Sequence, residues 1–193
     1  MSGYDVVVMG ASWGGLRALE HLFGELPADF PTPIVVAQHR DDDSDDELLP
    51  RLLNRHTGLC IVDADDKAPL EPGTVLLSPP GYHVLISEGV VELNVDEPVQ
   101  FSRPSIDVLF ETAADQYGRR AVGVLLTGAN ADGAAGLEEI ARRGGHTIVQ
   151  DPDDAERPEM PRAALQRMTP DVVAPLGDIA GLLCSACGKE PAR

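Results

Sequence analysis

Three side chains that could carry out acyl transfer each follow an apolar stretch of the sequence. Each of the three, Ser12, His39 and Asp132, follows a run rich in Val, Ile, Leu and Ala. A hydroxyl, an imidazole and a carboxylate are the groups of a nucleophile, its general base and the acid that orients the base. Their order along the chain, Ser then His then Asp, differs from that in chymotrypsin, subtilisin and the α/β-hydrolases. The residue types therefore predict a serine hydrolase of another architecture.

The glycine-rich turn around Ser12 admits two other interpretations. Residues 10–15 match part of the G-x-G-x-x-G dinucleotide fingerprint, but Ser12 replaces its middle glycine. The next apolar run ends in Gln38-His39 and not in the acidic residue that binds ribose. Residues 10–14 also match the G-x-S-x-G elbow, yet in the α/β-hydrolase fold several strands precede that elbow and the histidine comes last. Nucleotide binding is the weakest of these hypotheses.

Short apolar runs alternate with helical patterns and define the scaffold that must position these side chains. Strands are expected at residues 5–9, 34–37, 60–62, 75–77, 83–86, 90–93, 122–126, 146–149 and 172–174. Helices are expected at residues 15–23, 48–53, 105–117, 134–143, 161–168 and 176–184. This alternation indicates an α/β fold: a doubly wound, mostly parallel sheet with helices on both faces. The close spacing of the three runs between residues 75 and 93 predicts added antiparallel hairpin pairing.

The predicted sheet explains how residues distant in the sequence could meet. Parallel strands end at one common edge, where open α/β sheets bind their ligands, and Ser12, His39 and Asp132 all follow such ends. Free N–H groups at helix starts also point toward this edge and favour negative charge. One alternative remains open for Asp132, because aspartate before a helix is a common N-cap.

The composition fits one compact domain over residues 1–193. The chain has 43% hydrophobic residues, a formal net charge of −17 and a pI of about 4.4. Such a surface repels nucleic acid and anionic membranes, so neither is an expected partner. No run is long enough to span a bilayer, and no signal peptide is visible. With an odd number of cysteines, these features predict a cytoplasmic protein without a disulfide framework.

Two of the three cysteines, Cys184 and Cys187, form a C-x-x-C motif near the C-terminus. A redox pair is favoured at a helix start, where the thiolate is stabilised, whereas this motif falls at a predicted helix end. A zinc site would need two further ligands, and Cys60 is the only other cysteine. The sequence therefore predicts neither a metal nor another cofactor.

Five short motifs occur in one order along nearly the whole chain. They are GASWGG from residue 10, QH from 38, SPPGYH from 78, RPSIDVLF from 103 and LTGANADGAAG from 126. As a set they resemble the catalytic domain of the chemotaxis protein-glutamate methylesterases. The resemblance implies a doubly wound α/β domain with a triad of Ser12, His39 and Asp132. It also implies the substrate: glutamate methyl esters on chemoreceptor signalling helices, with receptor glutamines as targets of deamidation.

Further expectations concern the other residues of the site and the partners. The Trp13 N–H, next after the nucleophile, is the first candidate donor to the oxyanion, and the Ala129 loop is the second. His83, Arg103 and Asn130 are expected to line the cleft. For His83 the sequence leaves a second interpretation open, a half-buried histidine with a satisfied hydrogen bond. The implied partners are a methylated chemoreceptor or a related signalling protein, together with a methyltransferase or histidine-kinase system.

The chain departs from the family's usual motifs around the predicted site. Trp13 stands where a small residue or Thr is common, Ala129-Asn130 replaces Met-Gly, and Arg40-Asp41 replaces Met-Pro. These changes bear on substrate identity more than on chemistry. An alternative is an inactive member that only binds a receptor or a methyltransferase, as expected if Trp13 fills the cleft. The first strand starts almost at the N-terminus, so no receiver domain and no control by its phosphorylation are expected.

Overall fold

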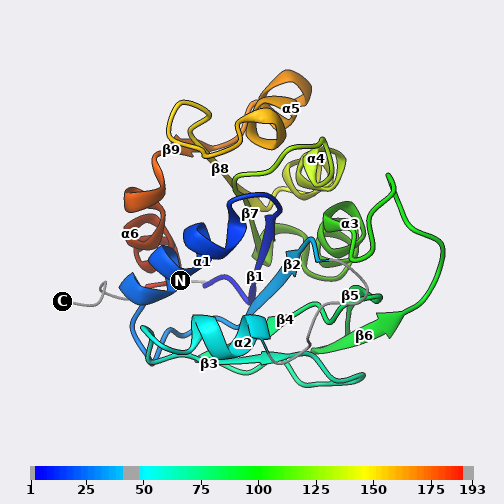
Figure 1. Ribbon diagram of the computed structural model, residues 1–193, viewed down its shortest axis with the longest axis vertical. Helices are drawn as coiled ribbons and strands as arrows, with labels where there is room; N and C mark the ends of the chain where they lie inside the picture. The colour runs from blue at the N-terminus through cyan, green and yellow to red at the C-terminus, as the bar shows by residue number, and fades with distance from the viewer. Residues whose placement is uncertain (1–2, 41–47, 189–193) are drawn as a thin grey trace.

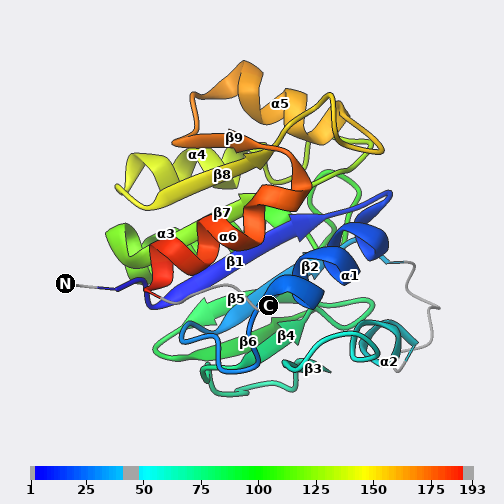
Figure 2. The ribbon, with the colours of Figure 1, turned by 90° about the vertical axis from the view of Figure 1, so that its left-hand side faces the viewer.

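A parallel sheet lies at the centre of the protein, in a computed structural model that describes residues 3–40 and 48–188. Its strands are β1 (Val6–Ala11), β2 (Ile34–Gln38), β3 (Cys60–Asp63), β4 (Thr74–Leu77), β7 (Ala121–Leu125), β8 (His146–Gln150) and β9 (Val172–Ala174). Within the described residues the sheet has seven strands in the order β3-β4-β2-β1-β7-β8-β9, paired in parallel throughout. The main strands point the same way in Figure 2.

The strand order reverses beside β1, which fixes where a ligand would bind. From β1 the chain runs through β2 toward one edge of the sheet, and it later returns to β7 on the opposite side of β1. Met9 in β1 pairs with Val36 in β2 and with Val124 in β7. The carboxyl ends of these three strands therefore lie side by side, at the kind of switch point where open α/β sheets hold ligands.

Helices cover both faces of the sheet. One face is packed by α1 (Gly15–Glu25), α2 (Leu48–Leu53) and α6 (Leu176–Cys187). The other is packed by α3 (Ile106–Tyr117), α4 (Ala134–Arg142) and α5 (Glu159–Arg167), with a short 3-10 turn, η1 (Gly118–Arg120), after α3. In Figure 1, α1 and α6 lie to the left of the sheet, and α3 and α4 to its right. The prediction of a doubly wound α/β fold is confirmed.

One detail of the predicted strand pairing is wrong. Residues 75–77 belong to β4, which pairs in parallel with both β2 and β3 inside the main sheet. Both edges of β4 are therefore occupied, and no antiparallel neighbour can join it. The antiparallel hairpin consists of β5 (His83–Ser87) and β6 (Val90–Asn94), which form a small sheet of their own. This hairpin packs against α3.

A close approach between α3 and β1 brings the start of α3 to the edge of the sheet. All six residues of β1 are buried, as expected for a strand covered on both faces. Gly10 in this strand has no room for a side chain, because a Cβ there would lie 2.3 Å from Ile106 Cγ2. The first turn of α3 is thus held against β1, close to Ser12. None of the described helices has the length and apolar character needed to cross a bilayer.

Candidate active site

Ser12 lies immediately beyond β1, at the carboxyl edge of the sheet. Its N–H donates to the Thr127 carbonyl (3.0 Å), and its own carbonyl accepts from the Gly15 N–H (2.9 Å). Gly14 has a φ of +80° and supplies the left-handed residue that turns the chain into α1. The Ser12 hydroxyl is therefore presented on a turn that backbone hydrogen bonds hold in place.

His39 lies beyond β2, the strand next to β1. Its N–H donates to the Ala11 carbonyl (3.1 Å). The Gln38 amide donates to the carbonyls of Ser12 (2.9 Å) and His39 (3.1 Å). Gln38 also lies tightly against α1, since a Cβ at Gly15 would be 2.0 Å from Gln38 Oε1. Gln38 thus joins the Ser12 and His39 turns, a function that the sequence analysis did not predict.

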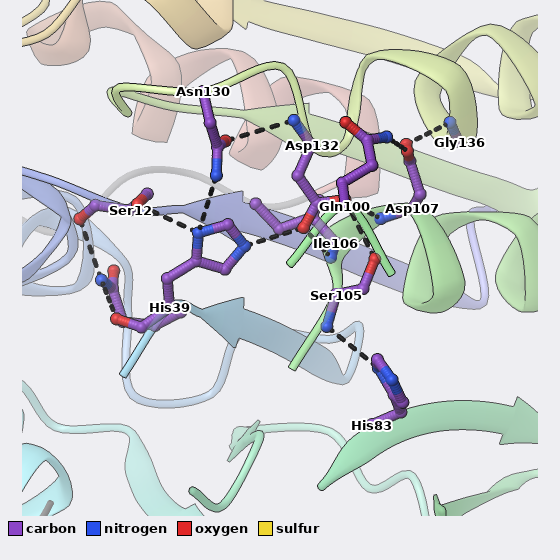
Figure 3. A network of polar contacts seen from close by, with 11 residues as sticks. Ser12, His39, His83, Gln100, Ser105, Ile106, Asp107, Asn130, Asp132 and Gly136 are labelled. Atoms are coloured by element: carbon purple, nitrogen blue, oxygen red, sulfur yellow. Dashed lines mark hydrogen bonds and ion pairs between the residues drawn. The ribbon is translucent and has the colours of Figure 1, made fainter. Parts of the chain in front are cut away.

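The imidazole of His39 lies between Ser12 and Asp132 (Figure 3). Its Nδ1 is 3.1 Å from Ser12 Oγ, and its Nε2 is 2.7 Å from Asp132 Oδ2. Because the Asp132 carboxylate can only accept, it selects the tautomer with hydrogen on Nε2. Nδ1 is then an acceptor for the Ser12 hydroxyl proton. The structure therefore brings together the three side chains that the sequence predicted to converge.

Asp132 is fully buried and sits at the N-terminus of α3. Its carboxylate accepts from the Ser105 hydroxyl (3.0 Å) and from the backbone N–H groups of Ile106 (2.7 Å) and Asp107 (3.0 Å). Burial raises the pKa of this carboxyl, but the hydrogen bonds from His39 and from the α3 backbone outweigh burial and lower it. Asp132 thus accepts from the first turn of α3, a helix distant in the sequence. The alternative interpretation of Asp132 as the N-cap of the helix that follows it is wrong, because Gly133 occupies the N-cap position of α4.

Asp107, in the first turn of α3, caps α4 in the same way that Asp132 caps α3. Its carboxylate accepts from the Gly136 N–H (2.7 Å), near the start of α4, and from the Gln100 amide (2.6 Å). Burial raises the pKa of Asp107, and the negative charge of Asp132 raises it further. Asp132, which precedes α4, therefore caps α3, and Asp107, which belongs to α3, caps α4. No local spacing in the sequence indicates this pair, because Asp107 lies on α3 and Asp132 lies in the loop before α4.

His83 accepts a hydrogen bond from Ser105, on the side of Ser105 away from His39. The ring is buried; its Nδ1 accepts from the Ser105 N–H (3.1 Å), and its Nε2 lies 3.2 Å from the Glu97 carbonyl. In Figure 3 the ring lies beyond Ser105, away from the His39 imidazole. This buried, hydrogen-bonded position matches the second interpretation that the sequence left open for His83, and it differs from a cleft wall. Arg103 also points elsewhere, donating to the Val95 and Asp96 carbonyls (3.2 and 3.3 Å).

Asn130 and Trp13 lie at the mouth of the site in different ways. Asn130 Nδ2 is 3.4 Å from His39 Nδ1, so this side chain contacts the imidazole as expected. Its Oδ1 accepts from the Asp132 N–H (3.2 Å). The indole of Trp13 is 59% exposed and lies under the Arg157 guanidinium, 5.3 Å from the ring centroid. An indole placed on the surface does not support the alternative in which Trp13 fills the cleft.

The loop after β7 touches Ser12 directly. A Cβ at Gly128 would lie 3.0 Å from Ser12 Cβ and 2.4 Å from Met160 Cε. The Thr127 hydroxyl holds this loop, accepting from the Arg157 N–H (2.8 Å) and donating to the Trp13 carbonyl (3.0 Å). Among the residues that the structure describes, the N–H groups of Trp13 and Ala129 donate to no other group. Both remain available to a bound oxygen.

Arg40, the departure next to His39, connects three strands. Its side chain is only 7% exposed, and it donates to Asp63 Oδ1 (2.6 Å) at the end of β3 and to the Ser78 carbonyl just beyond β4. It thereby fixes the end of β2 that carries His39. Asp41, its neighbour in the predicted departure, lies outside the described residues.

Cys184 and Cys187 lie at the C-terminal end of α6, as predicted, and neither forms a disulfide. Burial raises the pKa of both thiols, which disfavours the reactive thiolate. In the described part of the chain, no group of three or more His, Cys, Asp or Glu side chains is arranged to hold a metal ion.

Residues 7–183 match the family model described as CheB methylesterase. This chain belongs to the CheB methylesterase family. It is 43% identical over 180 residues to a putative protein-glutamate methylesterase/protein-glutamine glutaminase of Leptospira interrogans, covering 93% of each chain. It is 38% identical to the protein-glutamate methylesterase FrzG of Myxococcus xanthus, covering 93% of this chain and 54% of FrzG.

A solved structure supports the same assignment to the CheB methylesterase family. The catalytic domain of the Thermotoga maritima CheB methylesterase superposes with a TM-score of 0.89 at 30% sequence identity. The match covers 96% of this chain and 99% of that domain. The family predicted from the five motifs is therefore confirmed.

Proposed function

We propose that this protein is a serine esterase that hydrolyses glutamate methyl esters on a chemoreceptor or a related signalling protein. The observation that carries the proposal is the His39 imidazole, 3.1 Å from Ser12 Oγ and 2.7 Å from Asp132 Oδ2. The names of the relatives in Leptospira interrogans and Myxococcus xanthus support the choice of a methylated glutamate. The name of the Leptospira relative also supports deamidation of glutamine as a second activity.

In the first half of the proposed reaction, Ser12 Oγ attacks the ester carbonyl carbon. His39 Nδ1 accepts the hydroxyl proton, and Asp132 stabilises the imidazolium that forms. The tetrahedral intermediate then collapses, the bond to the methoxy oxygen breaks, and His39 returns the proton so that methanol leaves. The glutamyl group remains on Ser12 as an ester.

In the second half, water replaces methanol. His39 removes a proton from water, the resulting hydroxide attacks the acyl carbon, and the bond to Ser12 Oγ breaks as that oxygen regains a proton. The products are the free glutamate side chain and the regenerated enzyme. Deamidation follows the same steps, with ammonia in place of methanol as the leaving group.

The negative oxygen of each tetrahedral intermediate requires preorganised donors. We assign this function to the backbone N–H groups of Trp13 and Ala129, which are free of other partners within the described residues. The contact between Gly128 and Ser12 supports this assignment, because it keeps the second loop next to the acyl carbon. Loss of one such donor typically raises the barrier by about 3 kcal/mol. We further propose a cytoplasmic location, consistent with three free cysteines.

The proposal is tested by methanol release. A chemoreceptor signalling fragment, methyl-esterified on its glutamates, is incubated with the wild-type protein and with the Ser12→Ala variant. The wild type should release methanol in amounts equal to the new carboxylates, and the variant should fall to the uncatalysed rate. Equal release by both proteins would remove Ser12 from the chemistry, and no release by either would reject the proposed substrate.

A further inference from the structure

The connection between β6 and α3 stands out from the protein as an exposed arm. Residues 95–101, here called the Phe101 arm, are all exposed, and they include Val95, Val99 and Phe101. Phe101 is exposed to the full extent, at 103% of its reference area. Figure 1 shows this connection projecting from the right-hand side of the molecule beside α3. An aromatic ring held entirely in water marks a surface that is suited to a partner.

The tip of the arm is a tight turn built from unusual residues. Val99 and Ser102 exchange both backbone hydrogen bonds (3.1 and 2.9 Å), so Gln100 and Phe101 form a two-residue turn. Their φ angles are +49° and +64°. Glycine and asparagine are favoured at such positions, and a bulky side chain there is disfavoured. The fold thus holds an aromatic residue at a costly position without burying it.

Two contacts tie the arm to the candidate active site. The Gln100 amide donates to Asp107 (2.6 Å), the carboxylate that caps the helix after Asp132. Gln100 also lines, with Ala131, a hollow of about 320 Å³ beside the Asp132 loop. Phe101 is therefore held at a fixed place next to the rim of the site.

We propose that the Phe101 arm docks the methylated protein substrate, with the Phe101 ring against an apolar side chain close to the esterified glutamate. This proposal rests on the proposed function. Ala131 follows Asn130, whose side chain contacts the His39 imidazole. A protein substrate bound at Ser12 is large enough to extend over Ala131 and Gln100, whereas a small ester is not. Asp96 and Glu97 lie between Val95 and Val99 in the arm, so the matching surface is apolar with basic neighbours.

The charge of the chain argues against a second copy of this protein as the occupant. The formal net charge is −17, so two arms brought together would add like-charge repulsion to their contact. A substrate surface with basic residues next to the esterified glutamate meets no such penalty. Self-association through Phe101 is nevertheless a measurable outcome of the test below.

The test compares two substrates in Phe101→Ala and Phe101→Gly. The protein substrate is the methyl-esterified receptor fragment, and the small substrate is p-nitrophenyl acetate. We expect kcat/KM for the protein substrate, relative to that for the small ester, to fall at least about tenfold in both variants through a higher KM. Phe101→Gly suits the left-handed position, so its unfolding midpoint should stay near that of the wild type. Val173→Ala, at another exposed apolar residue, is the matched control and should leave kcat/KM unchanged for both substrates.

Each other outcome overturns the docking assignment. If kcat/KM for the protein substrate relative to that for p-nitrophenyl acetate stays unchanged in both variants, the arm does not contact the protein substrate. A dimeric wild type that becomes monomeric in Phe101→Ala would instead assign the arm to contacts between copies. Failure of the proposed function looks different, because the wild type would then release no methanol from the fragment, or Ser12→Ala would release as much.

Discussion

Asp132 and Asp107 cap each other's helices. Asp132 accepts hydrogen bonds from the first turn of α3, which contains Asp107, and Asp107 accepts one from the Gly136 N–H near the start of α4, which Asp132 precedes. The oxygen of Asp132 that accepts from the Ile106 N–H, Oδ2, also lies 2.7 Å from His39 Nε2. The carboxylate proposed to orient the imidazole is thus fixed by two helices at once.

Asp132→Asn should retain the fold but lose most of the activity. An amide oxygen in place of Oδ1 can still accept from the Ser105 hydroxyl and the Asp107 N–H. An NH2 in place of Oδ2 loses the acceptor for the Ile106 N–H and no longer holds hydrogen on His39 Nε2. The tautomer with hydrogen on Nδ1 then becomes available, and that nitrogen cannot accept the Ser12 proton. We expect kcat to fall by about 10⁴.

The Asp132→Asn measurement is the turnover of p-nitrophenyl acetate, with circular dichroism and the unfolding midpoint as controls for the fold. A well-folded variant that loses less than about tenfold in kcat would contradict the assigned role of Asp132.

The stability contributed by Asp107 should decrease as the pH rises. Burial raises the pKa of Asp107 in the folded state, so between the ordinary aspartate value of about 4 and the raised value the folded protein binds more protons than the unfolded one. Stability linked to this group is therefore fully present below pH 4 and is lost as the pH rises through the folded pKa. Relative to Asp107→Asn, the wild type should lose stability across this window.

Urea unfolding of the wild type and Asp107→Asn at several pH values between 4 and 7 gives the difference directly, because groups common to both proteins cancel. A difference that stays constant, or that grows in favour of the wild type with rising pH, would show that Asp107 has no raised pKa.

Gln38→Glu should lower activity although it changes only one atom of the side chain. A carboxylate cannot donate to the Ser12 and His39 carbonyls that the amide now joins, and it places negative charge against them. Loss of such a buried contact costs about 1–3 kcal/mol, so we expect the turns to shift and kcat to fall roughly 10- to 100-fold. Gln116→Glu, at an exposed position of α3, is the matched control. Equal kcat for the two variants would remove Gln38 from the positioning of the site.

Gly128→Ala should lower kcat because the new Cβ would lie 3.0 Å from Ser12 Cβ and 2.4 Å from Met160 Cε. Adding Met160→Ala relieves the second contact but leaves the first. The change in the free energy of unfolding of the double variant should therefore differ from the sum of the two single changes. Its kcat should stay at least about tenfold below that of Met160→Ala alone. Activity fully restored by Met160→Ala would show that the loop does not press on Ser12.

The sequence predicts the position of a residue best when that residue directly follows a strand, because the end of the strand then fixes where the residue lies. Ser12 and His39 could be placed at one edge because each follows an apolar strand, and the alternation of strands with helices predicted the doubly wound fold. Residues that act between elements gave no such signal. The link from Asp107 to α4 and the support of Ser105 by His83 depend on how α3, α4 and β5 pack, which no local spacing encodes.

The pairing of β4 shows the same limit. Short spacing favours hairpins, but partner choice for residues 75–77 depended on a parallel neighbour, β2, far earlier in the chain. The exposed Phe101 arm was also invisible from the sequence, because its positive φ angles occur at residues other than glycine.

The central claim is that His39 activates Ser12 for nucleophilic attack. The most direct measurement is covalent labelling by a fluorophosphonate, which reacts with activated serines, followed by mass spectrometry to locate the adduct. We expect a single adduct on Ser12, none in Ser12→Ala, and labelling at least about 10³-fold slower in His39→Ala. An adduct on a different residue, or an unchanged labelling rate in His39→Ala, would contradict this claim.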